Sequence, residues 1–430
     1  MRKRTPLVLL VVLVLGALSI LQACSGGSKD SGSGGKVKII WSVWGNPGEQ
    51  QRLQEFTDDF NKRHDDIEAE LAPIPGSYPE KIKTMLTGKT APDVFYADDS
   101  LMPQLINNGL IENLSPYLEN SSINPDDLYQ GLMTPATKDG SVYAIPPDMN
   151  PMVLWYNKKV LADAGIAESP ADLYEQGQWT WQKFQEMTDK IRASGKHGYI
   201  VDTWWAIYYT WVSANGGTFY SDDSYVGVSD PKSVEAYKYL YDNIQAKNFT
   251  FANVLPSGQG SEAQFMNNLA GFLSSGRWVL PNFKTKEGLE FDVVPHPTNT
   301  GKKIEPGAIA DAFVVMNADS KHKEAAWTFI EEFNNKDGQL FRLKDGGNAV
   351  PTMIGLDSLV EEGNLPEHAR YFLDAGEVGY VYPDYLYPSV SDEVFTQFDR
   401  LVQKKDVSFE EAMKEADVNA NKKLQELKAQ

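Results

Sequence analysis

The sequence contains only one cysteine in 430 residues, so it has no second thiol with which to form a disulfide. It also lacks the local patterns that typify metal and nucleotide sites. The five histidines are scattered, with no pair at the spacing of an HExxH helix, and there is no EF-hand loop. Gly258-Gln-Gly260 has neither a preceding strand nor the final glycine of a nucleotide loop, and no G-x-S-x-G elbow occurs. We therefore expect no metal and no organic cofactor.

An excess of basic charge is absent as well. The chain has 40 Lys and Arg against 59 Asp and Glu, and its net charge of −19 becomes −22 without the three basic residues at positions 2–4. Such a charge repels nucleic acid and anionic lipid surfaces, which excludes nucleic-acid binding. A glycosidase needs two carboxylates at a suitable separation, but adjacent acids such as Asp126-Asp127 are usually solvated turns or helix starts. The acidic pairs alone therefore do not indicate catalysis.

Only one long apolar run is present, from Leu7 to Leu21. It follows basic residues and is too short to span a bilayer comfortably, as in a signal peptide. It ends in Leu21-Gln22-Ala23-Cys24, which resembles the lipobox of bacterial lipoproteins. The resemblance implies a signal peptide over 1–23, a diacylglycerol on Cys24 and, over 24–35, a flexible Ser/Gly tether. Two acyl chains anchor a protein stably, so we expect it at the extracytoplasmic face of the cell membrane. The alternative is an ordinary secretory signal in which Cys24 is incidental.

The first part of the remaining chain alternates strands and helices. Lys36 to Trp44 is typical of a strand, and Asn46, Pro47 and Glu49 then suit the cap, first turn and capping-box acid of a helix. Further strands are predicted over 67–74 and 93–97, with a helix over 79–86. This order predicts an α/β fold with a parallel sheet, in which ligands bind beyond the carboxyl ends of the strands. Trp44-Gly45 and Asp98-Asp99 follow two such ends.

The rest of the chain predicts a second α/β lobe and passages between the two. The segment 143–157 contains prolines that a central strand does not tolerate, so we interpret it as a crossing between lobes. Residues 158–303 combine helices with shorter strands, 307–316 is typical of one strand, and 350–430 is mostly helical. Three crossings between the lobes would result.

Several short stretches resemble one known family in their order and spacing. They are Ile39 to Gly45, Ala91 to Phe95, Tyr143 to Pro146, Leu154 to Asn157, Trp179 to Phe184, Asn215-Gly-Gly217, Gly276-Arg-Trp278 and Ser320 to Phe329. Together they resemble the extracellular solute-binding proteins of bacterial ABC transporters, in the sugar-binding family related to maltose-binding protein. The resemblance implies a type II two-lobed fold, with one lobe over 36–147 and 306–348 and the other over 150–303 and 351–430. It also implies a sugar held in the cleft by hinge closure, and delivery to the permease subunits of an ABC importer.

A sugar site needs flat aromatic faces for its C–H face and fixed polar groups for its hydroxyls. The sequence has ten Trp and twenty Tyr. By position in the matching motifs, the expected ligand contacts are Trp44, Asp98, Asp99, Asn150, Trp204, Trp205, Trp278, Gly347 and Asn348, with Arg277, Tyr382 and Tyr385 as further candidates. Any of these aromatics could instead belong to a lobe core, and Asp99 could cap the helix that follows it. Trp155, Trp181 and Trp327 are expected in the cores.

The sequence leaves other functions open. The protein could bind a different solute, such as a polyol, a peptide or a polyamine, and a polyamine would require acidic groups that converge in the cleft. A surface-anchored carbohydrate-active enzyme is a further alternative. We expect a non-enzymatic monomer that binds a small carbohydrate, whose length, linkage and charge the sequence does not specify.

Overall fold

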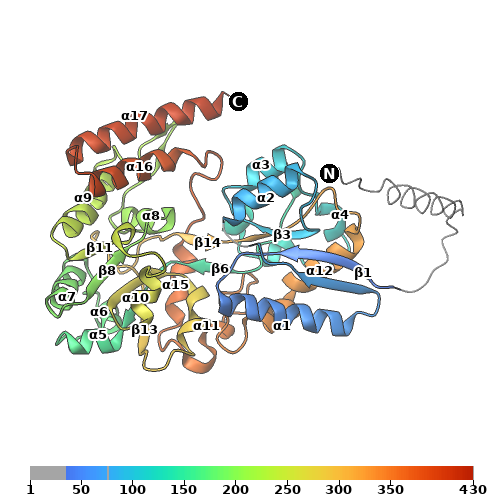
Figure 1. Ribbon diagram of the computed structural model, residues 1–430, viewed down its shortest axis with the longest axis horizontal. Helices are drawn as coiled ribbons and strands as arrows, with labels where there is room; N and C mark the ends of the chain where they lie inside the picture. Colours follow the sequence, from blue (N-terminus) through green and yellow to red (C-terminus); the bar gives the residue numbers. More distant parts are fainter. Residues whose placement is uncertain (1–34, 75–76, 430) are drawn as a thin grey trace, which may run out of the picture. The chain divides into compact units, whose positions relative to one another are not determined.

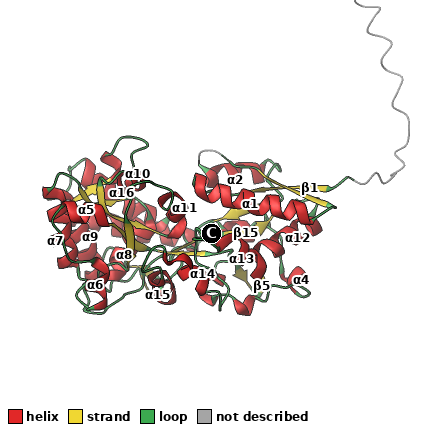
Figure 2. Ribbon diagram, turned by 90° about the horizontal axis from the view of Figure 1, so that it is seen from below, coloured by secondary structure: helices red, strands yellow, loops and turns green. Residues whose placement is uncertain are grey.

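Two β-sheets, each surrounded by helices, are the main features of the computed structural model (Figure 1). It describes residues 35–74 and 77–429, and residues 37–430 belong to one unit. In Figure 2 the strands of each group run through the interior and the helices lie outside them. The predicted signal peptide and Cys24 lie outside the described residues.

The first sheet has four strands in the order β15-β3-β1-β2. Strand β1 pairs in parallel with β2 and β3, as predicted, while β15 returns antiparallel to β3 at the edge. The strands are β1 (Val37–Ser42), β2 (Ile67–Leu71), β3 (Val94–Ala97) and β15 (Phe313–Met316). The associated helices are α1 (Pro47–Arg63), α2 (Tyr78–Thr87), α3 (Met102–Asn107), α4 (Ser115–Leu118), α12 (Lys323–Asn334) and α13 (Lys336–Leu343).

Helix α1 begins at the predicted capping box. Asn46 Oδ1 accepts from the Glu49 backbone N–H at 3.1 Å, and the Asn46 backbone N–H donates to Glu49 Oε2 at 2.8 Å. Because both caps are made by side chains, the chain leaves β1 and enters α1 with a fixed turn at Trp44 and Gly45. This turn sets the position of the residues that follow the first strand.

The second sheet has five strands in the order β11-β8-β12-β7-β13. Strand β8 is parallel to β11 and β12, whereas β7 is antiparallel to β12 and β13. The strands are β7 (Val153–Asn157), β8 (His197–Val201), β11 (Phe249–Phe251), β12 (Ala270–Ser275) and β13 (Phe291–Val294). The helices before residue 300 are α5 (Lys158–Asp163), α6 (Pro170–Glu175), α7 (Trp181–Ala193), α8 (Trp205–Ala214), α9 (Pro231–Gln245), α10 (Ser261–Met266) and α11 (Leu280–Phe283).

The C-terminal part of the chain is mostly helical, as predicted. It contains α14 (Ser358–Glu361), α15 (Arg370–Val378), α16 (Val390–Gln403) and α17 (Phe409–Lys428), of which α16 and α17 lie beside α8 and α9 in Figure 1. Short elements complete the fold: hairpins β4 (Thr137–Lys138) with β5 (Ser141–Val142) and β9 (Tyr220–Ser221) with β10 (Ser224–Tyr225), and single turns η1 (Pro125–Asp127), η2 (Gln130–Met133), η3 (Ala252–Val254), η4 (Arg277–Val279) and η5 (Glu362–Asn364).

Three crossing segments lie side by side between the two sheets. Strand β6 (Met149–Pro151) pairs antiparallel with β14 (Ile309–Asp311), and Met149 also exchanges two backbone hydrogen bonds of 2.9 Å with Val350. The prediction of one strand over 307–316 is wrong, because the strand is interrupted at Ala312 and the segment forms two strands, β14 and β15. Before the break β14 pairs with β6, and after it β15 pairs with β3, so one apolar run serves two sheets.

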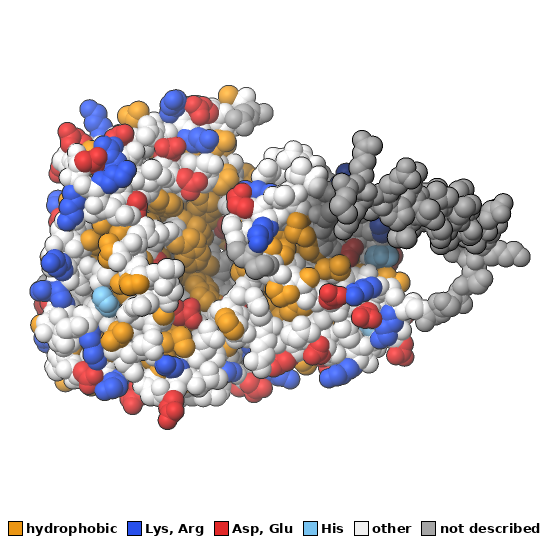
Figure 3. Space-filling model, in the orientation of Figure 1, with side chains coloured by type: hydrophobic (Ala, Val, Ile, Leu, Met, Phe, Trp, Pro, Cys, Tyr) orange, Lys and Arg blue, Asp and Glu red, His pale blue; other side chains and the backbone are white. Residues whose placement is uncertain are grey.

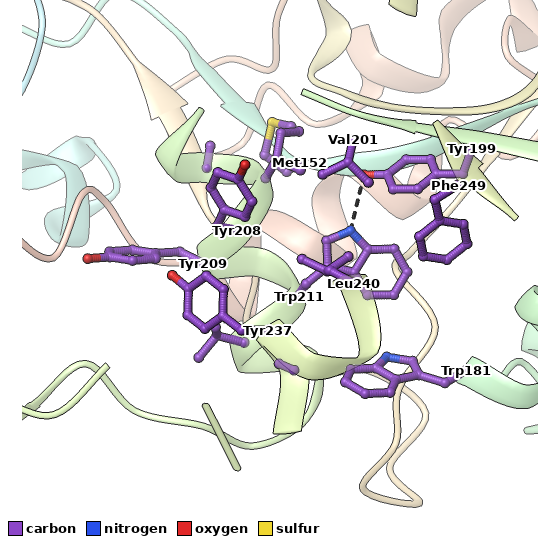
Figure 4. Packing of buried hydrophobic residues seen from close by; sticks show 14 of the residues in the cluster. Met152, Trp181, Tyr199, Val201, Tyr208, Tyr209, Trp211, Tyr237, Leu240 and Phe249 are labelled. Atoms are coloured by element: carbon purple, nitrogen blue, oxygen red, sulfur yellow. Dashed lines mark hydrogen bonds between the residues drawn. The ribbon is translucent and has the colours of Figure 1, made fainter. Parts of the chain in front are cut away.

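Each sheet has its own hydrophobic core. Around the first, Trp41 contacts Phe329 at 4.9 Å between ring centroids, and α1 adds Phe56 on the same face. In the second core, shown in Figure 4, Trp211 is fully buried and donates its indole N–H to the Tyr199 hydroxyl at 3.1 Å. The prediction that three tryptophans are core residues is confirmed: they are Trp155, Trp181 and Trp327, all buried.

Within the described part of the chain, no helix combines the length and the apolarity needed to cross a membrane. All strands of the first sheet fall in the ranges 36–147 and 306–348, and all strands of the second in 150–303. The exact residues at which each lobe begins and ends remain a prediction.

Candidate functional site

A cavity of about 880 Å³ lies between the two sheets, and Figure 3 shows hydrophobic side chains in the hollow between the two groups of elements. Its lining comes from the ends of β1 and β3, from β6 and β14, and from the starts of α8 and η4. The structure brings nine of the residues predicted from sequence to this cavity: Trp44, Asp98, Asp99, Asn150, Trp204, Trp205, Trp278, Asn348 and Tyr382.

Three tryptophans form an aromatic cluster on the side of the second sheet. Trp204 is the N-cap residue of α8, and its ring lies edge-on to Trp205 at 5.8 Å and to Trp278 at 6.0 Å. Trp204 is 36% exposed, the most open position of the three. Trp205 in turn contacts Tyr382 at 4.7 Å. These rings offer flat apolar faces to whatever occupies the cavity.

Gly276 makes room for the Trp278 ring. A Cβ at position 276 would lie 2.1 Å from Cζ3 of Trp278 and 2.7 Å from Cβ of Asn150. The ring therefore packs over the bare backbone between β12 and η4. The Gly276-Arg-Trp278 motif thus owes its glycine to close packing.

A second group of rings lies on the side of the first sheet. Trp44 meets Tyr78 and Tyr96 edge-on, each at 5.3 Å between centroids. Both tyrosines line the cavity but were absent from the predicted site. Tyr78 precedes a proline at the start of α2, and Tyr96 lies within a four-residue buried strand, so in the sequence each is an ordinary structural residue.

The adjacent acids Asp98 and Asp99 make different hydrogen bonds. Asp98 Oδ1 accepts from the Leu101 backbone N–H at 3.0 Å and from Ser100 Oγ at 2.5 Å, and so caps the turn before α3. Asp99, which is 4% exposed, instead accepts from the Tyr382 backbone N–H at 3.0 Å. Burial, with a smaller contribution from the charge of Asp98, raises the pKa of Asp99 to about 8. The pair therefore joins the end of β3 to the chain at Tyr382.

Asp311 on β14 also lines the cavity, although the sequence analysis did not select it. The residue is half-buried, yet both carboxylate oxygens are buried, and no other described residue donates a hydrogen bond to them. The backbone N–H of Asp311 itself acts to lower the pKa of this carboxyl. Burial and the charges of Asp99 and Asp98 raise the pKa of Asp311 well above its usual range. A lone acid in the apolar run Ala308 to Met316 was the sequence signal for it.

Glu49 has a second role beyond the capping box. Its Oε1 accepts from Asn348 Nδ2 at 3.3 Å, and the residue lines the cavity. Burial raises the pKa of Glu49 to about 7, although its hydrogen bonds with Asn46 and Asn348 act in the opposite direction. The contact joins the start of α1 to the third crossing.

Asp148 is the cavity-lining acid that has a basic partner. Its Oδ2 accepts from Arg342 Nη1 at 2.8 Å, and both residues are buried. Burial raises the pKa of Asp148 in spite of this pair. The ion pair fixes the chain just before β6 against α13.

Arg277, Gly347 and Tyr385 are not among the residues that line the cavity. The Arg277 side chain is fully buried behind it, where Nε donates to the Gly347 carbonyl at 3.0 Å and the guanidinium lies 5.6 Å from the Phe372 ring centroid. Burial lowers the pKa of Arg277 to about 10. A Cβ on Gly347 would lie 2.5 Å from the Leu343 backbone, and Tyr385 packs against the second core. Gly347 and Tyr385 thus have packing roles, while both Nη groups of Arg277 are buried without a hydrogen-bond partner among the described residues.

Asn150 contacts the backbone of Arg277 and, unlike Arg277, lines the cavity. Its Oδ1 accepts from the Arg277 backbone N–H at 2.8 Å, which ties the first crossing to η4. Across the cavity mouth, Asn46 Nδ2 donates to the Trp278 carbonyl at 2.9 Å. The aromatic cluster is therefore hydrogen-bonded to elements of the first sheet.

One group of described residues has the composition of a metal site, away from the cavity. Ligand atoms of Asp292, Glu367 and His368 lie within 4.8 Å of one another. However, the Lys158 ammonium lies 3.4 Å from Asp292 and 3.0 Å from Glu367. Because Lys158 pairs with both carboxylates and His368 Nδ1 lies 2.8 Å from Asp292, the group is better described as a structural ion cluster.

The chain matches the model of the bacterial extracellular solute-binding protein family over residues 44–340. Binding proteins of Brucella abortus and Brucella suis are 23% identical over 269 residues, and this alignment covers 60% of the chain but only 62% of their length. The arabinooligosaccharide-binding protein of Bacillus subtilis (strain 168) is 22% identical over 377 residues, covering 84% of this chain and 81% of the relative.

Solved structures confirm the predicted two-lobed fold. An ABC substrate-binding protein of Listeria monocytogenes in complex with cycloalternan gives a TM-score of 0.80 at 23% identity, over 91% of this chain and 100% of that one. Maltose-bound MalE3 of T. maritima gives 0.75 at 23% identity over the same shares. With the family model matched over most of its length, the chain belongs to the bacterial extracellular solute-binding proteins.

Proposed function

We propose that this protein is the substrate-binding component of an ABC importer and holds a sugar in the cavity between its lobes. The observation that carries the proposal is the cavity itself, whose walls combine the surfaces of aromatic rings with buried carboxylates and amides. The names of relatives agree with this, since they include arabinooligosaccharide- and maltodextrin-binding proteins. After closure about the crossing strands, the loaded protein would deliver the sugar to the membrane permease.

The cavity chemistry suits a pyranose or furanose. Trp278, Trp205 and Trp44 supply faces for the C–H surfaces of sugar rings. Asn150 and Asn348 supply amide donors and acceptors, and the carboxylates supply acceptors for hydroxyl groups. A volume of about 880 Å³ exceeds what one monosaccharide fills, so we propose an oligosaccharide as ligand.

We further propose that Cys24 carries a lipid and holds the monomeric protein at the outer face of the cell membrane. The support is the lipobox-like sequence at 21–24, together with one relative named as a lipoprotein in Streptomyces antibioticus. In the native bacterium, Cys24→Ser should release the protein from the membrane fraction into the medium. Retention of this variant on membranes would contradict lipidation at Cys24.

A solute that carries amines is the second candidate. Acidic groups do converge in the cavity, which is the condition that a polyamine ligand requires. A carbohydrate-active enzyme is less well supported, because the family and the relatives are named as binding proteins.

A thermal-shift screen of the purified protein tests the function. Arabino-, malto- and chito-oligosaccharides, acidic saccharides, polyols and polyamines are compared at matched concentrations. A ligand that binds only the folded form adds about 2.7 kcal/mol at 100 times its Kd, a rise of several degrees at most. Response to one saccharide class supports the proposal and identifies the substrate. Response to polyamines alone favours the second candidate, and turnover of a glycan would favour an enzyme.

A further inference from the structure

The cavity has a pronounced imbalance of charge. Seven of its described lining residues are Asp or Glu, and Lys83 is the single basic one among them. Of the acids, Asp148 is paired with Arg342, and Lys83 lies 3.6 Å from Glu80 on its own helix. Uncharged sugar hydroxyls need acceptors, but they do not need so large an excess of acids over basic residues.

The imbalance is greatest where β3 and β14 meet. Asp98, Asp99 and Asp311 line the same cavity, and the antiparallel register of Phe313 with Ala97 brings the chain at Asp311 back toward Asp99. The charges of Asp98 and Asp99 raise the pKa of Asp311, and the backbone N–H of Tyr382 donates to Asp99. The other charged groups that act on this trio are Asp148 with its Arg342 partner, and Lys83 through Asp98. Asp311 adds two buried oxygens to which no other described residue donates a hydrogen bond. Leaving a buried carboxylate without donors is costly, so a missing partner is indicated.

Aromatic rings lie beside this carboxylate trio. Tyr382, whose N–H contacts Asp99, has its ring 4.7 Å from Trp205, and both line the same cavity. Carboxylates together with aromatic faces form the surroundings in which proteins hold ammonium groups, since both attract positive charge. This second feature is independent of the acids and also faces the cavity.

We propose that the ligand of this cavity carries a protonated amine, which binds against Asp98, Asp99 and Asp311. The inference rests on the proposed function in one respect: the amine would belong to a saccharide, so that the tryptophans hold the sugar rings while the trio holds the cation. A hydroxyl in the same place would leave the carboxylates protonated, whereas an ammonium group can pair with their ionised forms.

The cation would replace a proton. With the pKa of Asp99 at about 8 and that of Asp311 raised, the trio retains a proton at pH 7 in the free protein. An ammonium group among the carboxylates stabilises their ionised forms, so the proton passes to the buffer as the ligand binds. Affinity for spermidine, whose amines stay protonated over this range, should therefore rise between pH 6 and pH 8.

Titration calorimetry with a matched pair of sugars tests this proposal. The probes are the disaccharide of β-1,4-linked glucosamine, its N,N′-diacetylated form, which lacks the charge, and spermidine, each in two pH 7 buffers of different ionisation enthalpy. We expect the free amine to bind at least tenfold more tightly than the acetylated sugar, with proton release. Asp311→Asn should abolish the preference, whereas Asp65→Asn, which removes an equal charge at an exposed position outside the cavity lining, should keep it.

The outcomes separate the two proposals. Equal binding of both disaccharides, or tighter binding of the acetylated one, overturns the amine site and leaves sugar binding standing. Spermidine binding without either sugar supports the amine site and contradicts the sugar function. If none of the probes binds, the amine site is contradicted, and the saccharide screen decides the function by itself. Asp99→Asn serves as a second variant if Asp311→Asn does not fold.

Discussion

Asp384 and Asp311 are both acids with buried carboxylates, but their surroundings differ. Asp384 lies in the core of the second lobe, where the hydroxyls of Tyr209 and Tyr220 donate to it at 2.7 and 2.6 Å. Asp311 lies at the cavity, and its carboxylate receives no hydrogen bond from any other described residue. The comparison shows that burial of an acid alone says little about its role. Whether the protein itself supplies the donors distinguishes a structural acid from one that awaits a partner.

The largest change in stability is expected on substitution of Asp384, whose carboxylate accepts hydrogen bonds from tyrosine hydroxyls. Asp384→Ala leaves two buried tyrosine hydroxyls without their acceptor, so unfolding free energy should fall by about 3 kcal/mol or more. Urea denaturation measures this loss, and Asp384→Asn, which keeps an acceptor oxygen, should lose less. Sugar affinity of the folded protein should stay within about twofold. A stability equal to that of the parent would remove the distinction between the two acids.

Substitution of Asp311 is expected to raise the stability of the ligand-free protein, in contrast to substitution of Asp384. Its raised folded pKa means that the folded state keeps a proton which the unfolded state has already lost. Stability is therefore full below the unfolded pKa and falls as the pH rises toward the folded value. Asp311→Asn removes this loss, so its melting temperature should exceed that of the parent by about 2 °C at pH 8 and match it near pH 4. A variant that is less stable than the parent at pH 8 would contradict the assignment.

A cavity tryptophan and a core tryptophan can be compared in the same way as the two acids. Trp278→Ala should weaken sugar binding at least about tenfold, or 1.4 kcal/mol, with little change in melting temperature, because its ring lines the cavity. Trp327→Ala is the matched control: the ring is buried in the first core, so its removal should lower stability by about 3–5 kcal/mol and leave affinity unchanged. Unchanged affinity of Trp278→Ala would exclude it from the site.

The smallest effect is expected at Trp204. It belongs to the same aromatic cluster but is 36% exposed, so less of its surface is available to be buried by a ligand. Trp204→Ala should weaken binding about two- to threefold in the same calorimetric assay. A loss as large as that of Trp278→Ala would mean that the rim of the cavity contributes as much as its interior.

Local chemistry made much of the fold predictable. The capping residues Asn46 and Glu49 fixed the start of α1, and the alternation of strands and helices indicated the first sheet. The break at Ala312 was not predictable, because hydrophobic periodicity reports that a residue is buried but not which sheet its strand joins.

The site was predicted in part for the same reason. Residues at strand ends, such as Trp44 and Asp99, could be placed because the carboxyl ends of strands face a common cleft. Glu49 and Tyr96 were missed because their local roles, a helix cap and a strand interior, already explained them. The charge of Arg277 made it a candidate, but the direction of its side chain depends on tertiary packing with Gly347 and Phe372.

The crossing strands also form the floor of the cavity. Asn150 belongs to β6 and Asp311 to β14, and these two strands lie at the pivot about which the lobes would rotate. Points near a rotation axis hardly move, whereas residues farther from it move through a larger distance. A ligand would thus bind the residues of the crossing strands in the open form and keep these contacts while the lobes close. Capture would then proceed in two steps, with the stationary residues choosing the ligand and the moving ones retaining it.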